Sequence, residues 1–398
     1  MRIGFMNVGT EILLGDTFNT NGNSLSKILL SNGYILEFDL SVSDDIHDIE
    51  LALKFLTNNS DVLIISGGLG PTEDDMTKEY ISSITGNKII EDLEHTAWMQ
   101  KIWNKRGIDM PGLNKKQSYI FNGYDKIPNS VGTALGATLN YNNTKIFLTP
   151  GPPREFIPMV EDYVIPQIKN IYEGSNPKFK YVTIYGVPES TLAAEINIFK
   201  PIGLDLSYLP SYGVVKIRYD KSIVSDKNER VLLEGLEKIY SNNIVSYSNT
   251  SLQKILVDSL LFKKKNISMI ESVTGGKVAS LLVEIPGASK VFTQSKVLYQ
   301  NQQKKIFLEV DSLNKDWYEL SQLLAEKIFD TSNASFSLSV LGEAGPTTSS
   351  IYKVGEVFIA LKDKERNIVN RYNFNGDRND VINQACNQCL FDIINFYK

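Results

Sequence analysis

The stretch DVLIISGGLGPTEDD, residues 61–75, joins an apolar run to a glycine-rich turn and then to acidic residues. A continuous apolar run, here residues 62–65, is typical of a strand that is buried on both faces of a parallel sheet. Open sheets of this kind bind their ligands just beyond the carboxyl ends of the strands. The stretch therefore predicts an α/β fold with a ligand site at the glycine turn.

The rest of the first 170 residues alternates strand-like and helix-like patterns. Apolar residues recur at helical spacing between residues 46 and 56, shortly before this strand. The segment IFLTPGPPREF, residues 146–156, repeats the design, with an apolar strand followed by a rigid proline turn. We therefore expect residues 1–170 to form one α/β domain, with a parallel sheet between helices on both faces.

The pattern changes after residue 170. Short strand-like segments, with a helical segment at residues 189–199 between the first two, predict a small α+β module over residues 171–250. Polar residues near Thr250 mark a linker. The helical segment SLQKILVDSLLF then opens a second α/β unit, residues 251–398. Three domains agree with the length of the chain, 398 residues.

The composition limits the possible partners. Hydrophobic residues make up 42% of the chain and charged residues 22%, which is typical of a soluble globular protein. The net charge of -5 argues against a nucleic-acid partner. Apolar runs are much shorter than the ~20 residues that span a bilayer, and the N-terminal segment does not resemble a secretory signal. We expect a cytoplasmic protein that binds neither nucleic acid nor membrane.

The cysteines and histidines offer little chemistry. Cys386 and Cys389 form a C-x-x-C pattern, but they share helical spacing with apolar neighbours and have no histidine near them. We therefore expect both thiols to be core residues rather than a redox or metal pair. His47 and His95 are the only histidines, and neither has an obvious partner. Acid–base chemistry must therefore depend on carboxylates, lysine, tyrosine or hydroxyl groups.

The glycine turn of the first unit has the features of a phosphate site. Glycines let an anion approach the backbone N–H groups of residues 67–70 closely. Asp74 and Asp75 follow at once, and carboxylates repel a phosphate unless a divalent cation lies between them. The pattern therefore indicates a phosphorylated ligand with a metal. A tight turn with an N-capping aspartate explains the same residues about equally well.

The last unit carries a second strand-to-helix turn in MIESVTGGKVASLL, residues 269–282. The turn is expected to present Ser272 at the N-terminus of a helix, which attracts anions. Ser272 is then either a plain N-cap or a nucleophile that needs a base. The segment VLYQNQQKKIF supplies a candidate base in Lys304, whose pKa must be lowered by burial or by a cation such as Lys305 or Arg378.

Several segments occur in the order and wording of one protein family. They are VGTEILLGDTFNTNGNSLSKIL, SGGLGPTEDDMTKE, NKKQ, VGTALGA, PGPPREFIPM, ESVTGG and YQNQQK. Over its whole length the chain resembles the CinA proteins (competence/damage-inducible protein A). The resemblance implies a homodimer, with a MoaB/MogA-like three-layer α/β domain that hydrolyses the pyrophosphate of ADP-ribose using a divalent metal (Mg, Mn or Co). It also implies a C-terminal α/β domain that deamidates nicotinamide mononucleotide (NMN) without a cofactor.

The resemblance also assigns site residues by position. In the first unit it implies metal and water handling by Glu11, Asp74, Asp75 and Glu155, with Asp75 catalytic, and phosphate binding by Gly67, Gly68, Gly70 and Thr72. In the last unit it implies Ser272 as nucleophile, Lys304 as base, Tyr299 as a further catalytic residue, and substrate binding by Thr274, Gly275, Gly276, Gly345 and Arg378. The implied reaction is attack of Ser272 on the carboxamide of NMN, with release of ammonia.

The sequence departs from the family pattern around the second site. LGEAGP replaces TGIAGP, so Leu341 stands in place of a hydroxyl residue and Glu343 in place of isoleucine. The segment at residues 310–322 lacks the family's GAVSE. These departures leave a second hypothesis open, a nucleotide-binding or regulatory protein that has lost one or both activities. A third hypothesis, a pterin ligand for the first unit, follows from the MoaB/MogA likeness.

Overall fold

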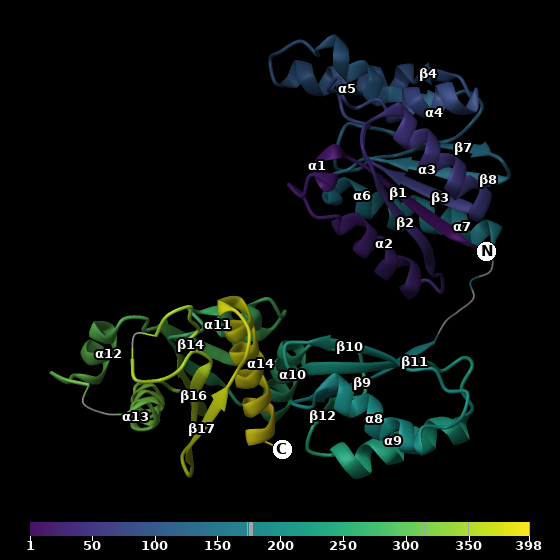
Figure 1. Cartoon of the computed structure of the whole chain (residues 1–398). Helices are drawn as coiled ribbons and strands as arrows, with labels where there is room; N and C mark the ends of the chain where they lie inside the picture. Colours follow the sequence, from purple (N-terminus) through teal and green to yellow (C-terminus); the bar gives the residue numbers. More distant parts are fainter. Residues whose placement is uncertain (173, 175–177, 314–315, 349, 398) are drawn as a thin grey trace. The chain divides into compact units, whose positions relative to one another are not determined.

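The computed structural model describes residues 1–172, 174, 178–313, 316–348 and 350–397. The described residues divide into two compact units, Met1–Pro177 and Lys178–Lys398 (Figure 1). The second unit contains both the α+β module and the last α/β domain, which the sequence divides at residue 250.

The first unit is built on a mixed sheet. Its elements are β1 (Ile3–Val8), α1 (Thr10–Leu13), α2 (Thr20–Ser31), β2 (Leu36–Val42), α3 (Ile46–Asn59), β3 (Val62–Ser66), α4 (Thr77–Thr85), β4 (Ile89–Glu91), α5 (Leu93–Lys105), a 3-10 helix (Gly112–Ser118), β5 (Tyr119–Phe121), β6 (Lys126–Ile127), β7 (Gly136–Tyr141), β8 (Thr144–Thr149), α6 (Pro153–Met159), a π-helical turn (Val160–Val164) and α7 (Ile165–Ile171). The strand order is β2-β1-β3-β8-β7-β6. The first four strands of this order are parallel, whereas β7 and β6 are antiparallel, so the expected purely parallel sheet is corrected to a mixed one.

Strand β3 shows why the quoted stretch organises this unit. Leu63 and Ile65 point to the face that α3 and α4 cover, and Val62 and Ile64 point to the face that α2, α6 and α7 cover (Figure 1). All four side chains are fully buried. A strand with helices on both sides needs apolar residues at every position rather than at alternate ones. The continuous apolar run therefore encodes a central strand.

The second unit begins with an antiparallel sheet. The elements of this middle module are β9 (Phe179–Tyr185), α8 (Glu189–Phe199), β10 (Ser207–Ser211), β11 (Val214–Asp220), α9 (Asp226–Tyr240) and β12 (Ile244–Ser246). The strand order is β10-β11-β9-β12, and α8 and α9 pack their apolar side chains on the sheet. The short strands and α8 are confirmed, and the structure adds α9.

The last domain also has a mixed sheet. Its elements are α10 (Leu252–Lys263), β13 (Ile267–Glu271), α11 (Lys277–Val283), a 3-10 helix (Ala288–Lys290), β14 (Phe292–Val297), α12 (Asn301–Leu308), α13 (Trp317–Asp330), β15 (Phe336–Gly342), β16 (Glu356–Lys362), β17 (Asn367–Asn373) and α14 (Arg378–Phe396). The order is β14-β13-β15-β16-β17, with β14, β13 and β15 parallel. One face is covered by α10, α11 and α14, and the other by α13. The sheet therefore presents the carboxyl ends of its parallel strands at one edge.

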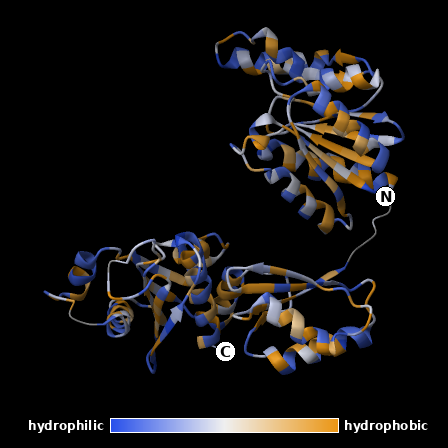
Figure 2. Ribbon diagram, in the orientation of Figure 1, coloured by the Kyte–Doolittle hydropathy of each residue, from blue (hydrophilic) through white to orange (hydrophobic). Residues whose placement is uncertain are grey.

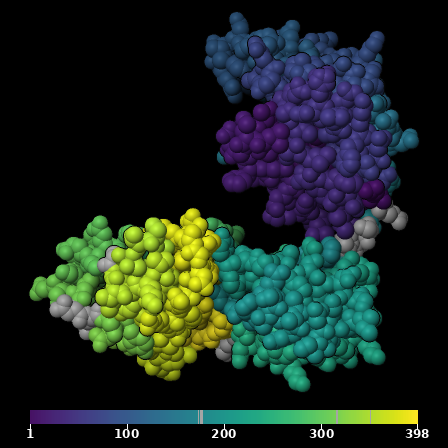
Figure 3. Space-filling view, viewed as in Figure 1, coloured from purple at the N-terminus to yellow at the C-terminus, as the bar shows by residue number. Residues whose placement is uncertain are grey.

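The middle module and the last domain share packing within the second unit. The ring of Tyr185, in β9, stacks on Phe391 of α14 with ring centroids 4.3 Å apart, and its hydroxyl donates a hydrogen bond to Gln388. Figure 3 shows the two parts, teal and green to yellow, in continuous contact. Buried contacts of this kind explain why the two segments form one compact unit.

Hydrophobic residues, orange in Figure 2, are concentrated in the central strands of the sheets. Cys386 and Cys389 are buried and unbonded to each other, in the core of the last domain, as the helical spacing predicted. Within the described ranges, no helix combines the length and the apolar character that a membrane span requires.

Candidate active sites

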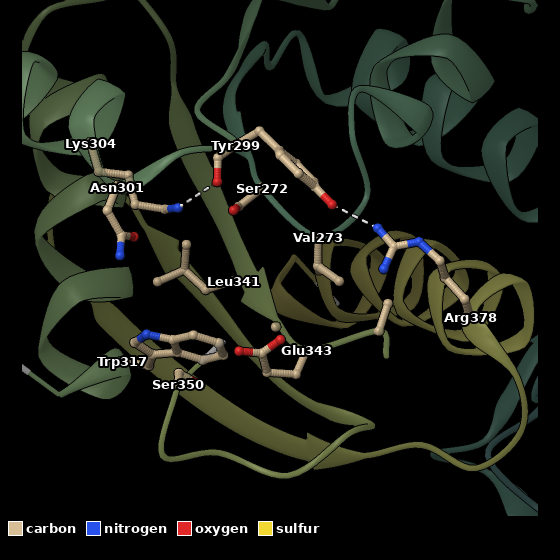
Figure 4. Close-up of a pocket in the computed structure, with 12 residues that line it drawn as sticks. Ser272, Val273, Tyr299, Asn301, Lys304, Trp317, Leu341, Glu343, Ser350 and Arg378 are labelled. Atoms are coloured by element: carbon tan, nitrogen blue, oxygen red, sulfur yellow. Dashed lines mark hydrogen bonds between the residues drawn. The ribbon is translucent and has the colours of Figure 1, made fainter. Parts of the chain in front are cut away.

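The last domain holds a small pocket at the carboxyl ends of β13 and β15 (Figure 4). It encloses about 150 Å³. Its lining residues come from segments that are distant in the sequence: Ser272, Val273, Tyr299, Asn301, Lys304, Trp317, Leu341, Gly342, Glu343, Ala344, Ser350 and Arg378. The fold therefore brings together Ser272, Lys304, Tyr299 and Arg378, the residues that the motifs singled out.

Ser272 is the first residue after β13. Its backbone N–H donates a hydrogen bond to the carbonyl oxygen of Val340, 3.0 Å away, and so extends the pairing with β15. Its hydroxyl lines the pocket, and no hydrogen bond occupies this hydroxyl among the residues that the structure describes. The turn therefore fixes the backbone of Ser272 and leaves the oxygen available for chemistry.

The predicted anion site at the start of α11 is wrong, because Glu271 already fills it. The fully buried Glu271 carboxylate accepts hydrogen bonds from the backbone N–H groups of Val278 (3.0 Å) and Ala279 (2.9 Å). It also accepts from the hydroxyls of Thr274 (2.8 Å) and Ser295 (3.2 Å). An internal carboxylate thus satisfies the helix end that was expected to bind substrate.

This arrangement corrects two expectations about the SVTGG turn. Ser272 is not the N-cap of α11, since the N-cap is Gly276. Thr274, Gly275 and Gly276 lie outside the lining of the pocket, where direct substrate binding was expected. Gly275 and Gly276 instead have φ values of 59° and 93°, which glycine adopts without strain. These residues shape the turn that positions Ser272.

Lys304 is the buried residue of α12, and its side chain is only 5% exposed. Its amine donates a hydrogen bond to the backbone carbonyl of Tyr299, 3.1 Å away. Burial lowers the pKa of Lys304 to about 8, while the nearby Glu343 carboxylate acts in the opposite direction. Of the two causes that the sequence left open, burial lowers the pKa of Lys304, and neither Lys305 nor Arg378 contributes.

Lys304 and Ser272 line one pocket, but no hydrogen bond joins the Lys304 amine to the Ser272 hydroxyl in the described part of the chain. Catalytic hydrogen bonds are often long before substrate binds and tighten in the complex. Ordinary lysines are protonated at neutral pH, whereas a pKa near 8 leaves a useful fraction of free amine. The pair has the chemistry of a nucleophile and its base.

Arg378 defines the mouth of the pocket. It is exposed and is the first residue of α14, where Asp377 and Asp380 form a capping box. The guanidinium donates hydrogen bonds to the hydroxyl of Tyr299 (2.6 Å) and to the carbonyl oxygen of Gly345 (2.5 Å). In Figure 4 the Tyr299 hydroxyl points toward Arg378. Tyr299, Gly345 and Arg378 thus form one hydrogen-bonded rim, and the remaining N–H groups of the guanidinium suit a phosphate.

Sequence reasoning did not single out six lining residues: Val273, Asn301, Trp317, Gly342, Ala344 and Ser350. Trp317 is the first residue of α13, which Asp316 caps. The capped helix start was readable from the sequence, but its position beside Ser272 was not. Part of the segment that lacks GAVSE, residues 314 and 315, lies outside the described residues. Both substituted loop residues, Leu341 and Glu343, line the pocket.

The first unit has a larger pocket of about 580 Å³, where β1, β3 and β8 end. Seven of the residues predicted for this site line it: Glu11, Gly67, Gly68, Gly70, Asp74, Asp75 and Glu155. Asp44, Gln117 and Thr133 also line the pocket and were not predicted. Thr72, which was also predicted for this site, is absent from the lining. Its N–H and hydroxyl donate hydrogen bonds to the Asp75 carboxylate, 2.9 and 2.5 Å away.

The acidic residues of this pocket do not form a ready metal site. Among the described residues, no group of three or more histidine, cysteine, aspartate or glutamate side chains is placed to hold a metal ion. Glu155 accepts a hydrogen bond from Asn129 (2.6 Å), and Asp75 accepts from Thr72. Magnesium is commonly bound by one or two carboxylates together with substrate phosphates. The residues therefore fit a divalent cation only in company with a phosphorylated ligand.

Two mixed α/β domains, each with a pocket at the carboxyl ends of parallel strands, and an antiparallel module define a multidomain protein with two candidate ligand sites. Residues 4–170 match the family described as probable molybdopterin binding domain, and residues 249–396 match the CinA C-terminal domain. A CinA-like protein from Dictyoglomus turgidum is 32% identical over 396 residues, which cover 96% of this chain and 95% of that protein.

A putative competence-damage inducible protein from Clostridium acetobutylicum is 31% identical over 402 residues, which cover 98% of each chain. A CinA protein of unknown function from Thermoplasma acidophilum, known from its crystal structure, is 31% identical to this chain. The match covers 44% of this chain and all of that protein, with a TM-score of 0.38. The chain belongs to the CinA family. The resemblance read from the motifs is thereby confirmed, together with the α/β multidomain fold and its MoaB-like first domain.

Proposed function

We propose that the last domain is a serine amidohydrolase that converts NMN into nicotinic acid mononucleotide and ammonia. One observation carries the proposal: a buried lysine whose pKa is lowered to about 8 opens into the same small pocket as an unbonded serine hydroxyl. Membership of the CinA family agrees with it. A desolvated position of this kind lets a lysine act as a base near neutral pH.

The proposed reaction has two stages. The free amine of Lys304 takes the proton of Ser272 as the serine oxygen attacks the carboxamide carbon of NMN. Lys304 then returns this proton to the leaving nitrogen, the carbon–nitrogen bond breaks and ammonia departs. Water, deprotonated by Lys304, attacks the resulting ester, releases nicotinic acid mononucleotide and restores the Ser272 hydroxyl. Lys304 acts as base and then as acid in each stage.

The shape of the pocket agrees with a mononucleotide. A cavity of about 150 Å³ is large enough for a single aromatic ring, because an engineered cavity of that order binds benzene. In the proposed complex, the nicotinamide ring fills this cavity, and its carboxamide group lies beside the hydroxyl of Ser272. The ribose and phosphate extend to the mouth, where the guanidinium N–H groups of Arg378 that are not bonded to Gly345 and Tyr299 can donate to an anion.

Ammonia release from NMN tests the proposal directly. The full chain is expected to release one ammonia per NMN, and Ser272→Ala is expected to reduce the rate at least ~10³-fold, since the nucleophile is lost. Ser280→Ala is the matched control, because Ser280 lies in the neighbouring α11 and does not line the pocket. Background rates in the parent chain, or equal rates in the parent and Ser272→Ala, would reject the proposal.

We propose a second activity for the first unit, the hydrolysis of ADP-ribose to AMP and ribose 5-phosphate. The observation in its favour is the run of glycine N–H groups, residues 67–70, beside Asp74 and Asp75 in one open pocket. A bound divalent metal would neutralise the pyrophosphate and favour attack by water. Asp74 and Asp75 would hold it, together with the phosphates of the substrate.

Chelation and one substitution test this second activity. Removal of divalent metal is expected to stop product formation, and Asp75→Asn is expected to slow it about 10²-fold, since a charge beside the phosphates is lost. Asp16→Asn serves as control, because Asp16 is an exposed residue outside the pocket lining. Activity that withstands both chelator and Asp75→Asn would place the reaction elsewhere.

An alternative is that one or both pockets bind nucleotides without turnover. The replacement of a hydroxyl residue by Leu341 favours it, because a lost hydrogen bond in an acyl-transfer site commonly costs ~10²-fold or more in rate. The alternative predicts that NMN or ADP-ribose raises the melting temperature while turnover stays at background. Turnover in the ammonia or AMP assay excludes it for the corresponding pocket.

A further inference from the structure

We propose that Glu343 and Trp317 recognise the positive charge of the substrate's ring, so that the pocket selects N-alkylated pyridinium rings over neutral aromatic rings. The inference rests on the proposed function, since it assumes that a nicotinamide ring enters this pocket. It assigns a purpose to a carboxylate that stands where the family pattern has isoleucine.

Glu343 is placed to act on a ligand inside the pocket. It follows β15 directly, its side chain is only 7% exposed, and it lines the cavity. In Figure 4 its carboxylate points toward the indole of Trp317. Glu343 is the acidic member of the described lining, which also contains Lys304 and Arg378. A cation that enters the cavity is therefore attracted electrostatically to the Glu343 carboxylate.

Trp317 offers a rigid aromatic surface at the same place. Its indole lies against Tyr352 with ring centroids 4.5 Å apart, and the edge of Phe358 meets it at 6.1 Å. Its backbone N–H donates a hydrogen bond to the hydroxyl of Tyr352 (2.9 Å). Indole is the best aromatic partner for a cation, and a fixed ring loses little entropy when it binds one. The two side chains combine a full charge with a polarised ring face.

The charge of Glu343 needs an explanation, because on its own it hinders the proposed base. A carboxylate beside Lys304 favours the protonated lysine, and it does raise the pKa of Lys304 against the effect of burial. A pyridinium ring beside Glu343 offsets that influence with its own positive charge. The carboxylate therefore hinders the base less in the complex with a cationic ring than in the complex with a neutral one.

A pair of ligands that differ in ring charge tests the inference. NMN carries a pyridinium ring, and the 5′-monophosphate of benzamide riboside presents a neutral benzamide ring of the same shape. Binding of both is measured by calorimetry on the full chain carrying Ser272→Ala, which prevents turnover. We expect NMN to bind at least tenfold more tightly than the neutral isostere.

The variant Glu343→Gln keeps the shape of the side chain and removes its charge. We expect it to bring the two affinities to within about twofold of each other, mainly by weakening NMN. Glu356→Gln is the matched control, since Glu356 is also buried but pairs with Arg371 and does not line the pocket. It should preserve the preference for NMN. If Glu343→Gln does not fold, Glu343→Ile, the residue of the family pattern, gives the same comparison.

The outcomes separate this inference from the proposed function. Equal binding of the two ligands, or a preference that Glu343→Gln leaves intact, overturns the inference even if the parent chain deamidates NMN. A preference that depends on Glu343 supports the inference even if the parent chain releases no ammonia. Failure of both ligands to bind overturns the inference and removes the mononucleotide pocket on which the deamidase proposal depends.

Discussion

The two pockets occupy equivalent places in their sheets but differ in how far they are assembled without a ligand. In the last domain, about 150 Å³ of space is surrounded by a buried amine, an available hydroxyl and a packed indole. In the first unit, about 580 Å³ is lined by glycines and carboxylates that form no metal-binding group among the described residues. Packed side chains surround the small pocket without a ligand, whereas the acidic groups of the large pocket do not converge in the described part of the chain.

The largest effect is expected when the buried amine of the small pocket is removed. Lys304→Met should reduce NMN deamidation about 10³-fold, because the base is lost while the apolar stem remains. Lys305→Met is the matched control, since Lys305 follows on the same helix but does not line the pocket. Rates of ammonia release from both variants measure the difference. Similar losses in the two variants would mean that the small pocket is not organised around Lys304.

A second buried lysine sharpens the comparison, because it lies in the first unit and is not among the residues that line the pocket of about 580 Å³. Lys78 is 2% exposed, and its amine donates a hydrogen bond to the carbonyl of Leu135 (2.8 Å). Burial lowers the pKa of Lys78 from 10.5 to about 7. At a pH between 7 and 10.5, the Lys78 amine is protonated in the unfolded chain but not in the folded chain. The free energy of unfolding therefore rises with pH over this range, by on the order of 3–5 kcal/mol.

This stabilising contribution is present above pH 10.5 and is lost as the pH falls through about 7. Lys78→Met should therefore flatten the rise in stability between pH 6.5 and pH 9.5, which urea unfolding of the two proteins at both pH values measures. An unchanged slope in the variant would show that Lys78 keeps its proton in the folded state.

The third prediction concerns the order of assembly in the large pocket. Without a nucleotide, Mn²⁺ should bind weakly, because no three described acidic or histidine side chains converge. With ADP-ribose present, Mn²⁺ should bind at least about tenfold more tightly, since phosphate oxygens supply the missing ligands. Electron paramagnetic resonance of free Mn²⁺ measures both affinities. Tight binding to the protein alone would remove the contrast between the two pockets.

The smallest effect is expected in the pH dependence of the small pocket. Deamidation should rise with pH and level off above about 8, because the unprotonated Lys304 is the base. The profile of kcat/KM reports the free enzyme, in which Glu343 raises the pKa of Lys304. In Glu343→Gln that profile should therefore move to lower pH. Measurement of kcat/KM as a function of pH for the parent chain and for Glu343→Gln tests this prediction. A shift of the profile to higher pH in the variant would contradict the effect of Glu343 on the pKa of Lys304.

Much of the local structure was predictable from the sequence. The apolar run at residues 62–65 became β3, and the residues after it line the large pocket, because a strand covered on both faces has no polar position to spare. The same holds for β13 and Ser272. Helix α8 matched its predicted range, residues 189–199, because its pattern and ends are local.

The errors have a common physical origin in contacts between distant residues. The helix end after ESVTGG has the local features of an anion site, but Glu271 turns back from the preceding strand and fills it. The sequence analysis also did not predict that the first sheet contains antiparallel strands. The direction in which two strands pair depends on both strands and on the chain that connects them, so the pattern of one strand does not reveal it.

By itself, the sequence determined the family, the strand-to-turn junctions and several of the residues that line each pocket, since these depend on short patterns and on side-chain chemistry. Only the tertiary structure decided which of those residues meet. It places Arg378 against Tyr299, 79 positions away, and it brings Trp317 and Glu343 into the pocket of Ser272. It also lowers the pKa of Lys304, because removal of water from an amine depends on all the segments that pack around it.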